Sequence, residues 1–155
     1  MANRLGDAVT GRRTTPLICT LARVVGAVFL LVGILGFIPG ITTHYDDMTF
    51  AGHESKAKLL DVFQVSVLHN VVHLLFGVAG LALSRTASSA FSYLVGGGVV
   101  YLVLWVYGLV TEHGSDANFV PVNDADNWLH LVLGIGMIAM GLLGRQRTGR
   151  RTSLL

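Results

Sequence analysis

The stretch LHNVVHLLFG, residues 68–77, places three polar side chains inside an otherwise apolar segment. They are His69, Asn70 and His73. The surrounding residues predict a helix that crosses a membrane, where polar side chains are costly and therefore usually meet protein, water or a bound group. This stretch thus bears both on the fold and on the function.

The composition of the 155-residue chain supports a membrane protein. Hydrophobic residues make up 52% of the chain and charged residues 13%, whereas a soluble domain carries about 25% charged residues. The mean hydropathy is +0.63 and the isoelectric point is about 9.0. Because the basic residues lie at the ends of apolar segments, the positive charge is explained without a nucleic-acid partner. The single cysteine, Cys19, excludes an intramolecular disulfide and a multi-cysteine metal site.

Four segments have the apolar character and the approximate length, about 20 residues, that crossing a bilayer requires. They cover residues 17–39, 62–83, 90–111 and 128–144. The last segment is short, but its helix can begin in the headgroup layer, with Asn123 or Asp124 as the N-cap. We therefore expect an all-α membrane protein with a four-helix transmembrane domain over residues 17–144 that lies in the lipid bilayer.

Basic residues gather on one side of these four segments. Arginines precede the first span, follow the fourth, and separate the second from the third at Arg85. The other two loops hold Lys56, Lys58 and most of the acidic residues. The positive-inside rule then predicts a multi-pass plasma-membrane protein with both termini in the cytoplasm. In this interpretation, residues 1–16 are a polar cytoplasmic segment and residues 145–155 a basic cytoplasmic tail.

The opening stretch has a counterpart 57 residues later. NVVHLLFG (70–77) matches NWLHLVLG (127–134), so that Asn, His, Leu and Gly recur at the same spacing. The first and third spans are also alike, in GAVFLLVGILG (26–36) and GVVYLVLWVYG (98–108). We interpret the matches as two tandem helical hairpins related by a pseudo-two-fold axis along the membrane normal. Chance similarity between apolar helices is the alternative.

Helical geometry places the repeated residues on one stripe of each even-numbered span. The two stripes are Ser66, Asn70, His73, Gly77, Gly80 and Ser84, and then Asn123, Asn127, His130, Gly134, Met137 and Gly141. Small residues let helix backbones approach closely in lipid. We therefore expect the second and fourth spans to pack stripe to stripe, with contacts at Gly77, Gly80, Gly134 and Gly141. His73 and His130 would then meet in the outer half of the bundle.

One interpretation of these polar residues is structural. Buried polar groups normally find hydrogen-bond partners. In a clasp between the two hairpins, Asn70 would bond His130 and Asn127 would bond His73.

Two further interpretations involve a bound group. His69 and His73 have the i,i+4 spacing that puts two imidazoles on nearly one helix face. His130 and Asp126 would complete a set suited to zinc or another divalent transition metal. Alternatively, one histidine from each of two facing helices would supply the axial ligands of a haem b.

Catalytic motifs are not evident in the sequence. The glycine triplet at 96–98 follows no predicted strand and lacks the GK[ST] of a phosphate loop, so close helix packing explains it better. We therefore expect a non-enzymatic membrane scaffold or accessory subunit of a larger membrane complex. It would associate with another membrane protein or with itself as an oligomer. The alternative is a metal- or haem-binding protein that uses His69, His73 and His130.

Four stretches together resemble a known family: GILGFIPGIT, VLHNVVHLLFGVAGLA, VVYLVLWVYGL and NFVPVNDADNWLHLVLGIGM. The family consists of small four-helix membrane proteins, occurs widely in actinobacteria and is named only as a domain of unknown function. The resemblance covers residues 17–144. It implies an integral plasma-membrane protein and implies no reaction.

Overall fold

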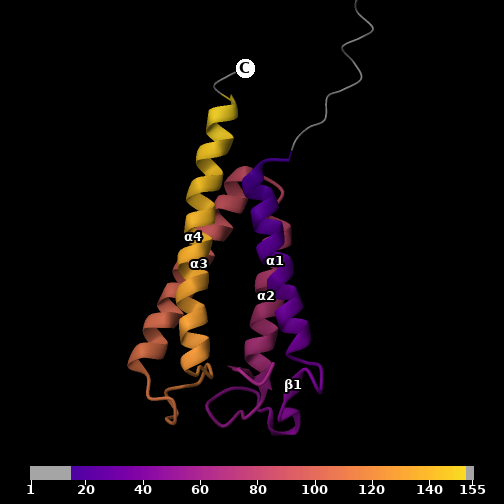
Figure 1. Ribbon diagram of the computed structural model, residues 1–155, viewed down its shortest axis with the longest axis vertical. Helices are drawn as coiled ribbons and strands as arrows, with labels where there is room; N and C mark the ends of the chain where they lie inside the picture. Colours follow the sequence, from indigo (N-terminus) through magenta and orange to yellow (C-terminus); the bar gives the residue numbers. More distant parts are fainter. Residues whose placement is uncertain (1–14, 153–155) are drawn as a thin grey trace, which may run out of the picture.

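Four helices form the body of the protein in the computed structural model, which describes residues 15–152 and the side chains up to residue 146. They are α1 (Leu17–Leu35), α2 (Val67–Leu83), α3 (Ala87–Val110) and α4 (Asp124–Thr152) (Figure 1). By length and composition α1, α3 and α4 can cross a membrane, while α2 is apolar but shorter. The predicted four-helix architecture is confirmed. Most of the expected polar N-terminal segment, residues 1–14, lies outside the described residues, as do residues 153–155.

Side-chain caps set the first residues of α2 and α4. The Ser66 hydroxyl accepts a hydrogen bond from the His69 amide at 3.2 Å. Asn123 Oδ1 accepts one from the Asp126 amide at 2.9 Å, and Asp126 Oδ2 accepts one from the Asn123 amide at 3.1 Å. This reciprocal arrangement is a capping box. Of the two residues expected to cap the fourth span, Asn123 is the one that does so.

The loop between α1 and α2 contains a small antiparallel sheet that the sequence did not predict. Its strands are β1 (Thr42–Thr43), β2 (Lys58–Leu59) and β3 (Phe63–Gln64), in the order β1-β2-β3. Strands of two residues carry no readable periodicity. Residues 62–66, expected to belong to the second span, therefore form β3 and the approach to α2.

At the other end of the chain, α4 continues as helix beyond residue 144 to Thr152.

The helices pack as two hairpins, with α1 beside α2 and α3 beside α4 (Figure 1). Glycines make both seams close. A Cβ added at Gly26 would lie 3.0 Å from the Gly77 carbonyl oxygen, and one added at Gly98 would lie 2.7 Å from the Gly134 carbonyl oxygen. Gly26 matches Gly98 in the repeat, and Gly77 matches Gly134. The same contact thus recurs at the same place in both hairpins, as tandem repeats require.

The predicted contact between the second and fourth spans is wrong. Apart from half-buried Asn123, the residues of both stripes are buried, but each stripe packs on the preceding helix of its own hairpin. Gly80 lies against Gly26 of α1 and also meets the Tyr93 ring of α3, and Gly141 lies against Val95 of α3. In the part of the chain that the structure describes, α2 and α4 barely approach each other. A stripe of small residues fits any helix that offers a small residue at the matching height, and Gly26 and Gly98 offer it.

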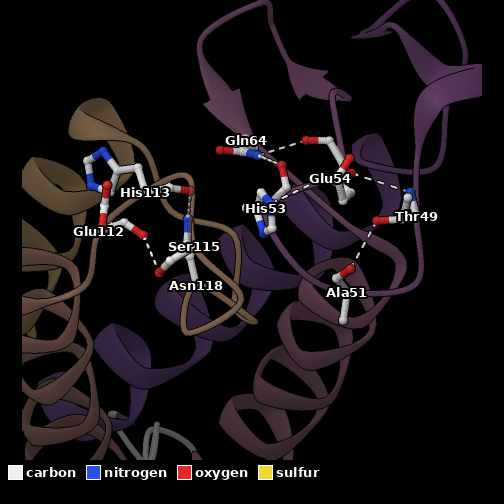
Figure 2. A network of polar contacts seen from close by, with 10 residues as sticks. Thr49, Ala51, His53, Glu54, Gln64, Glu112, His113, Ser115 and Asn118 are labelled. Carbon is white, nitrogen blue, oxygen red and sulfur yellow. Dashed lines mark hydrogen bonds and ion pairs between the residues drawn. The ribbon is translucent and has the colours of Figure 1, made fainter.

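The loops lie at the end of the hairpins opposite the α2–α3 turn (Figure 1). Figure 2 shows that the polar contacts drawn there form two groups, one in each loop. In one loop the Ser115 hydroxyl donates to the Glu112 carbonyl at 2.8 Å. In the other, Gln64 Nε2 donates to the His53 carbonyl at 3.3 Å. Each loop is thus folded on itself, which gives the loop end of the bundle a defined shape.

Candidate functional site

The centre of the bundle is a stack of two residues that occupy equivalent positions in the repeat. Phe29 of α1 and Tyr101 of α3 have ring centroids 5.3 Å apart and an interplanar angle of 18°. His73 lies 5.6 Å from the Phe29 ring at 59°, and His130 lies 5.4 Å from the Tyr101 ring at 56°. Because the two halves have nearly the same geometry, we place the pseudo-two-fold axis at this stack. His73 and His130 flank it on opposite hairpins.

His69 and His73 form a stacked pair on α2. Their ring centroids are 4.4 Å apart and their planes differ by 4°. His73 Nδ1 lies 3.0 Å from the backbone oxygen of His69. A carbonyl oxygen can only accept, so Nδ1 carries the proton and donates it. In the neutral ring Nε2 is then an acceptor.

Asp126, the repeat counterpart of His69, does not join the histidines. Its buried carboxylate is 2% exposed and accepts hydrogen bonds from the Gln64 amide at 2.9 Å and the Asn123 amide at 3.1 Å. It therefore ties β3 to the first turn of α4. Within residues 15–146, no group of three or more His, Cys, Asp or Glu side chains could hold a metal ion. The geometry gives no support to the metal set of three histidines and Asp126.

The predicted clasp of Asn70 and Asn127 with the histidines of the other hairpin is also wrong. Asn70 packs against Gly36 at the end of α1, and Asn127 packs against Gly108 of α3. Neither Oδ1 has a conventional hydrogen-bond partner among the described residues. In both hairpins the asparagine oxygen instead faces a glycine Cα, a geometry that fits a weak Cα–H···O contact. The asparagines therefore belong to the seams within the hairpins.

The three histidines line one cavity of about 270 Å³. It lies between α2, α3 and the start of α4, and residues 119–121 of the last loop cover it. Most of its wall is apolar and includes Val72 of α2 and Val100 of α3. His130 Nδ1 is buried and has no hydrogen-bond partner among the described residues. The cavity is therefore an apolar chamber with imidazole groups in its wall.

A family model described as Domain of unknown function (DUF4383) matches residues 20–143. The chain belongs to this family. The match confirms the resemblance inferred from the sequence motifs. No curated protein and no solved structure matches the chain significantly. Every residue that lines the histidine cavity falls inside the DUF4383 region, so the cavity is part of the family domain.

Sequence reasoning missed two parts of this DUF4383 site. Phe29 and Tyr101 are the fourth residues of the two matched stretches from the first and third spans. The alignment of the repeat therefore held a signal for them. The covering residues 119–121 carried no such signal, because their position depends on how the last loop folds back over the helices.

Proposed function

We propose that this protein binds a small, mostly apolar molecule in the histidine cavity of a membrane-embedded bundle and catalyses no reaction. The observation that supports this most is the composition of the cavity. Ligand sites are usually lined by apolar side chains with a few polar groups that orient the ligand. Three buried imidazoles in an otherwise mostly apolar wall fit that description.

The energetic state of His130 supports the same proposal. A buried donor or acceptor without a partner costs about 1–3 kcal/mol. His130 Nδ1 is such a group, because it is buried and has no partner among the described residues, and the residue lines the cavity. A ligand that lets the His130 ring turn this nitrogen toward the cavity and hydrogen-bonds to it would remove the cost.

The membrane placement is part of the proposal. Following the positive-inside rule, we infer a plasma-membrane protein with both termini in the cytoplasm. The cavity lies near the first turns of α2 and α4, at the loop end of the hairpins. In this orientation it belongs to the outer half of the membrane, and the lipid bilayer can deliver an apolar ligand to it.

The other functions expected from the sequence have less support. A haem would need room for a planar macrocycle, but the Phe29–Tyr101 stack connects His73 to His130 through ring contacts. The cavity volume also lies just below the range of about 300–1,000 Å³ that is common for ligand pockets, which suits a small ligand.

The role of scaffold or accessory subunit is compatible with ligand binding and stays a prediction. Titration with Zn²⁺ would test the metal alternative directly.

Histidine-selective ¹⁵N NMR of the purified chain in detergent micelles tests ligand binding. The probes are 4-propylphenol and its methyl ether. We expect at least one of them to shift the ring signals of His73 and His130 and to leave His113, an exposed loop histidine, unchanged. Val100→Phe should abolish the shifts by filling the cavity. Val99→Phe is the matched control, because Val99 and Val100 are 49% and 47% exposed but only Val100 lines the cavity. If neither probe shifts His73 or His130, the proposed function is refuted.

A further inference from the structure

We propose that the ligand of the cavity carries a hydroxyl group on an apolar body, as a phenol or a quinol does, and that it enters from the lipid between α2 and α3. This inference rests on the proposed function and specifies the chemical class of the ligand and its route.

The hydrogen-bonding state of the histidines points to the hydroxyl. His73 Nδ1 is committed to the His69 carbonyl, so the neutral ring offers an acceptor, Nε2. His130 in its neutral form offers one donor and one acceptor, and its Nδ1 is unpartnered among the described residues. A ketone or an ether can only accept, and therefore cannot satisfy His73. A hydroxyl both donates and accepts, so it suits the acceptor of His73 and either tautomer of the His130 ring.

The size of the cavity points to a ring-sized head. An engineered apolar cavity of about 150 Å³ in another protein binds benzene. The present cavity of about 270 Å³ therefore has room for a substituted ring. A longer apolar tail on such a ring would have to leave the cavity through its wall.

The wall between α2 and α3 is the side that faces hydrocarbon. Val72 of α2 and Val100 of α3 both line the cavity, yet they are 45% and 47% exposed. The helices within each hairpin pack closely, whereas α2 and α3 share few contacts. On the loop side, the Gly52 amide donates to the Phe119 carbonyl at 2.7 Å and ties residues 119–121 to the other loop, with the Phe119 side chain 55% exposed. Because the α2–α3 wall has no such tie between loops, we place the entry of an apolar ligand there.

Paired probes test the hydroxyl. The full chain in lipid nanodiscs is titrated with 4-propylphenol and with 4-propylanisole, its methyl ether, and the dissociation constants are taken from the His73 ring signal. We expect the phenol to bind about tenfold more tightly, which corresponds to about 1.4 kcal/mol. 4-Butylphenol, which matches the ether in size, should bind like the first phenol. His130→Leu should bring the ratio of the two constants toward one, whereas His113→Leu should keep it.

The outcomes separate this inference from the proposed function. Equal affinities for the phenol and the ether would overturn the hydroxyl assignment and leave ligand binding standing. Failure of both probes to bind would refute ligand binding itself. A ratio that survives His130→Leu would overturn the role given to the His130 ring.

Variants of one valine test the route. Val72→Ala should widen the wall and speed both association and dissociation of 4-propylphenol, and Val72→Phe should slow association. Val71 is the matched control, since it is also exposed on α2, at 37%, but does not line the cavity. Val71→Ala and Val71→Phe should leave the rates unchanged. Rates are read from NMR line shapes, and equal association rates in all four variants would overturn entry between α2 and α3.

Discussion

The glycine triplet at residues 96–98 of α3 allows the packing of α3 against α4 to be tested by substitutions in one helix. A Cβ added at Gly98 would lie 2.7 Å from the Gly134 carbonyl oxygen and 2.7 Å from Ile138 Cγ1. A Cβ added at Gly96 would meet no atom within 4 Å. Because one of the atoms at Gly98 is backbone, α3 and α4 must move apart to accept the methyl group. We therefore expect Gly98→Ala to destabilise the second hairpin and Gly96→Ala to leave it intact.

The magnitude follows from the comparison of the two variants. Replacing a helical glycine by alanine gains about 1 kcal/mol of helix propensity, and this gain is shared and cancels. Overpacking a closely packed site costs about 1–3 kcal/mol, and only Gly98→Ala incurs it. The free energy of unfolding should therefore be lower for Gly98→Ala than for Gly96→Ala by about 1–3 kcal/mol. The repeat predicts the same sign for Gly26→Ala, with a smaller cost, because its nearest atoms lie at 2.9–3.0 Å.

The assay is reversible unfolding in mixed micelles of mild detergent and sodium dodecyl sulfate, followed by circular dichroism at 222 nm. All three alanine variants are measured under the same conditions as the unsubstituted chain. If Gly98→Ala and Gly96→Ala have equal free energies of unfolding, the close α3–α4 seam is refuted. If Gly98→Ala lowers the free energy of unfolding and Gly26→Ala does not, the equivalence of the two seams is refuted.

Three further predictions concern the seams, the loops and the orientation. Gly108→Ala should destabilise the chain because the added Cβ overlaps the Asn127 side chain. Adding Asn127→Ala should restore part of the lost stability, with a coupling energy of about 0.5–3 kcal/mol in a double-mutant cycle. Strictly additive effects would contradict this contact. Asp126→Ala should lower the free energy of unfolding by about 1–3 kcal/mol, because a β3 amide loses its acceptor, and should speed hydrogen exchange of that amide, whereas Asp124→Ala at an exposed position should change neither. A cysteine at Ser115 should react with a membrane-impermeant reagent on intact cells, and labelling from the cytoplasmic side alone would reverse the proposed orientation.

Local patterns along the chain were enough to locate the helices and to show their pairing in tandem. Apolar runs of sufficient length and caps such as Ser66 and Asn123 are local properties, so the four helices could be located without a structure. The spacing shared by Asn70 and Asn127 revealed the repeat for the same reason. Helical periodicity also identified the stripes that are buried, because a stripe is a property of one helix.

What each buried side chain meets depends on how the helices and loops pack in three dimensions. A stripe shows which face is covered but not which helix covers it, and the glycines at matching heights on α1 and α3 made that choice. Asp126 illustrates the consequence. The sequence offered it as a metal ligand that would complete a set with the three histidines, but β3, whose two residues show no periodicity, brings an amide to its carboxylate. The histidine cavity likewise exists because three helices and a loop leave space between them. Space between elements depends on distances in three dimensions, and no local pattern along the chain encodes it.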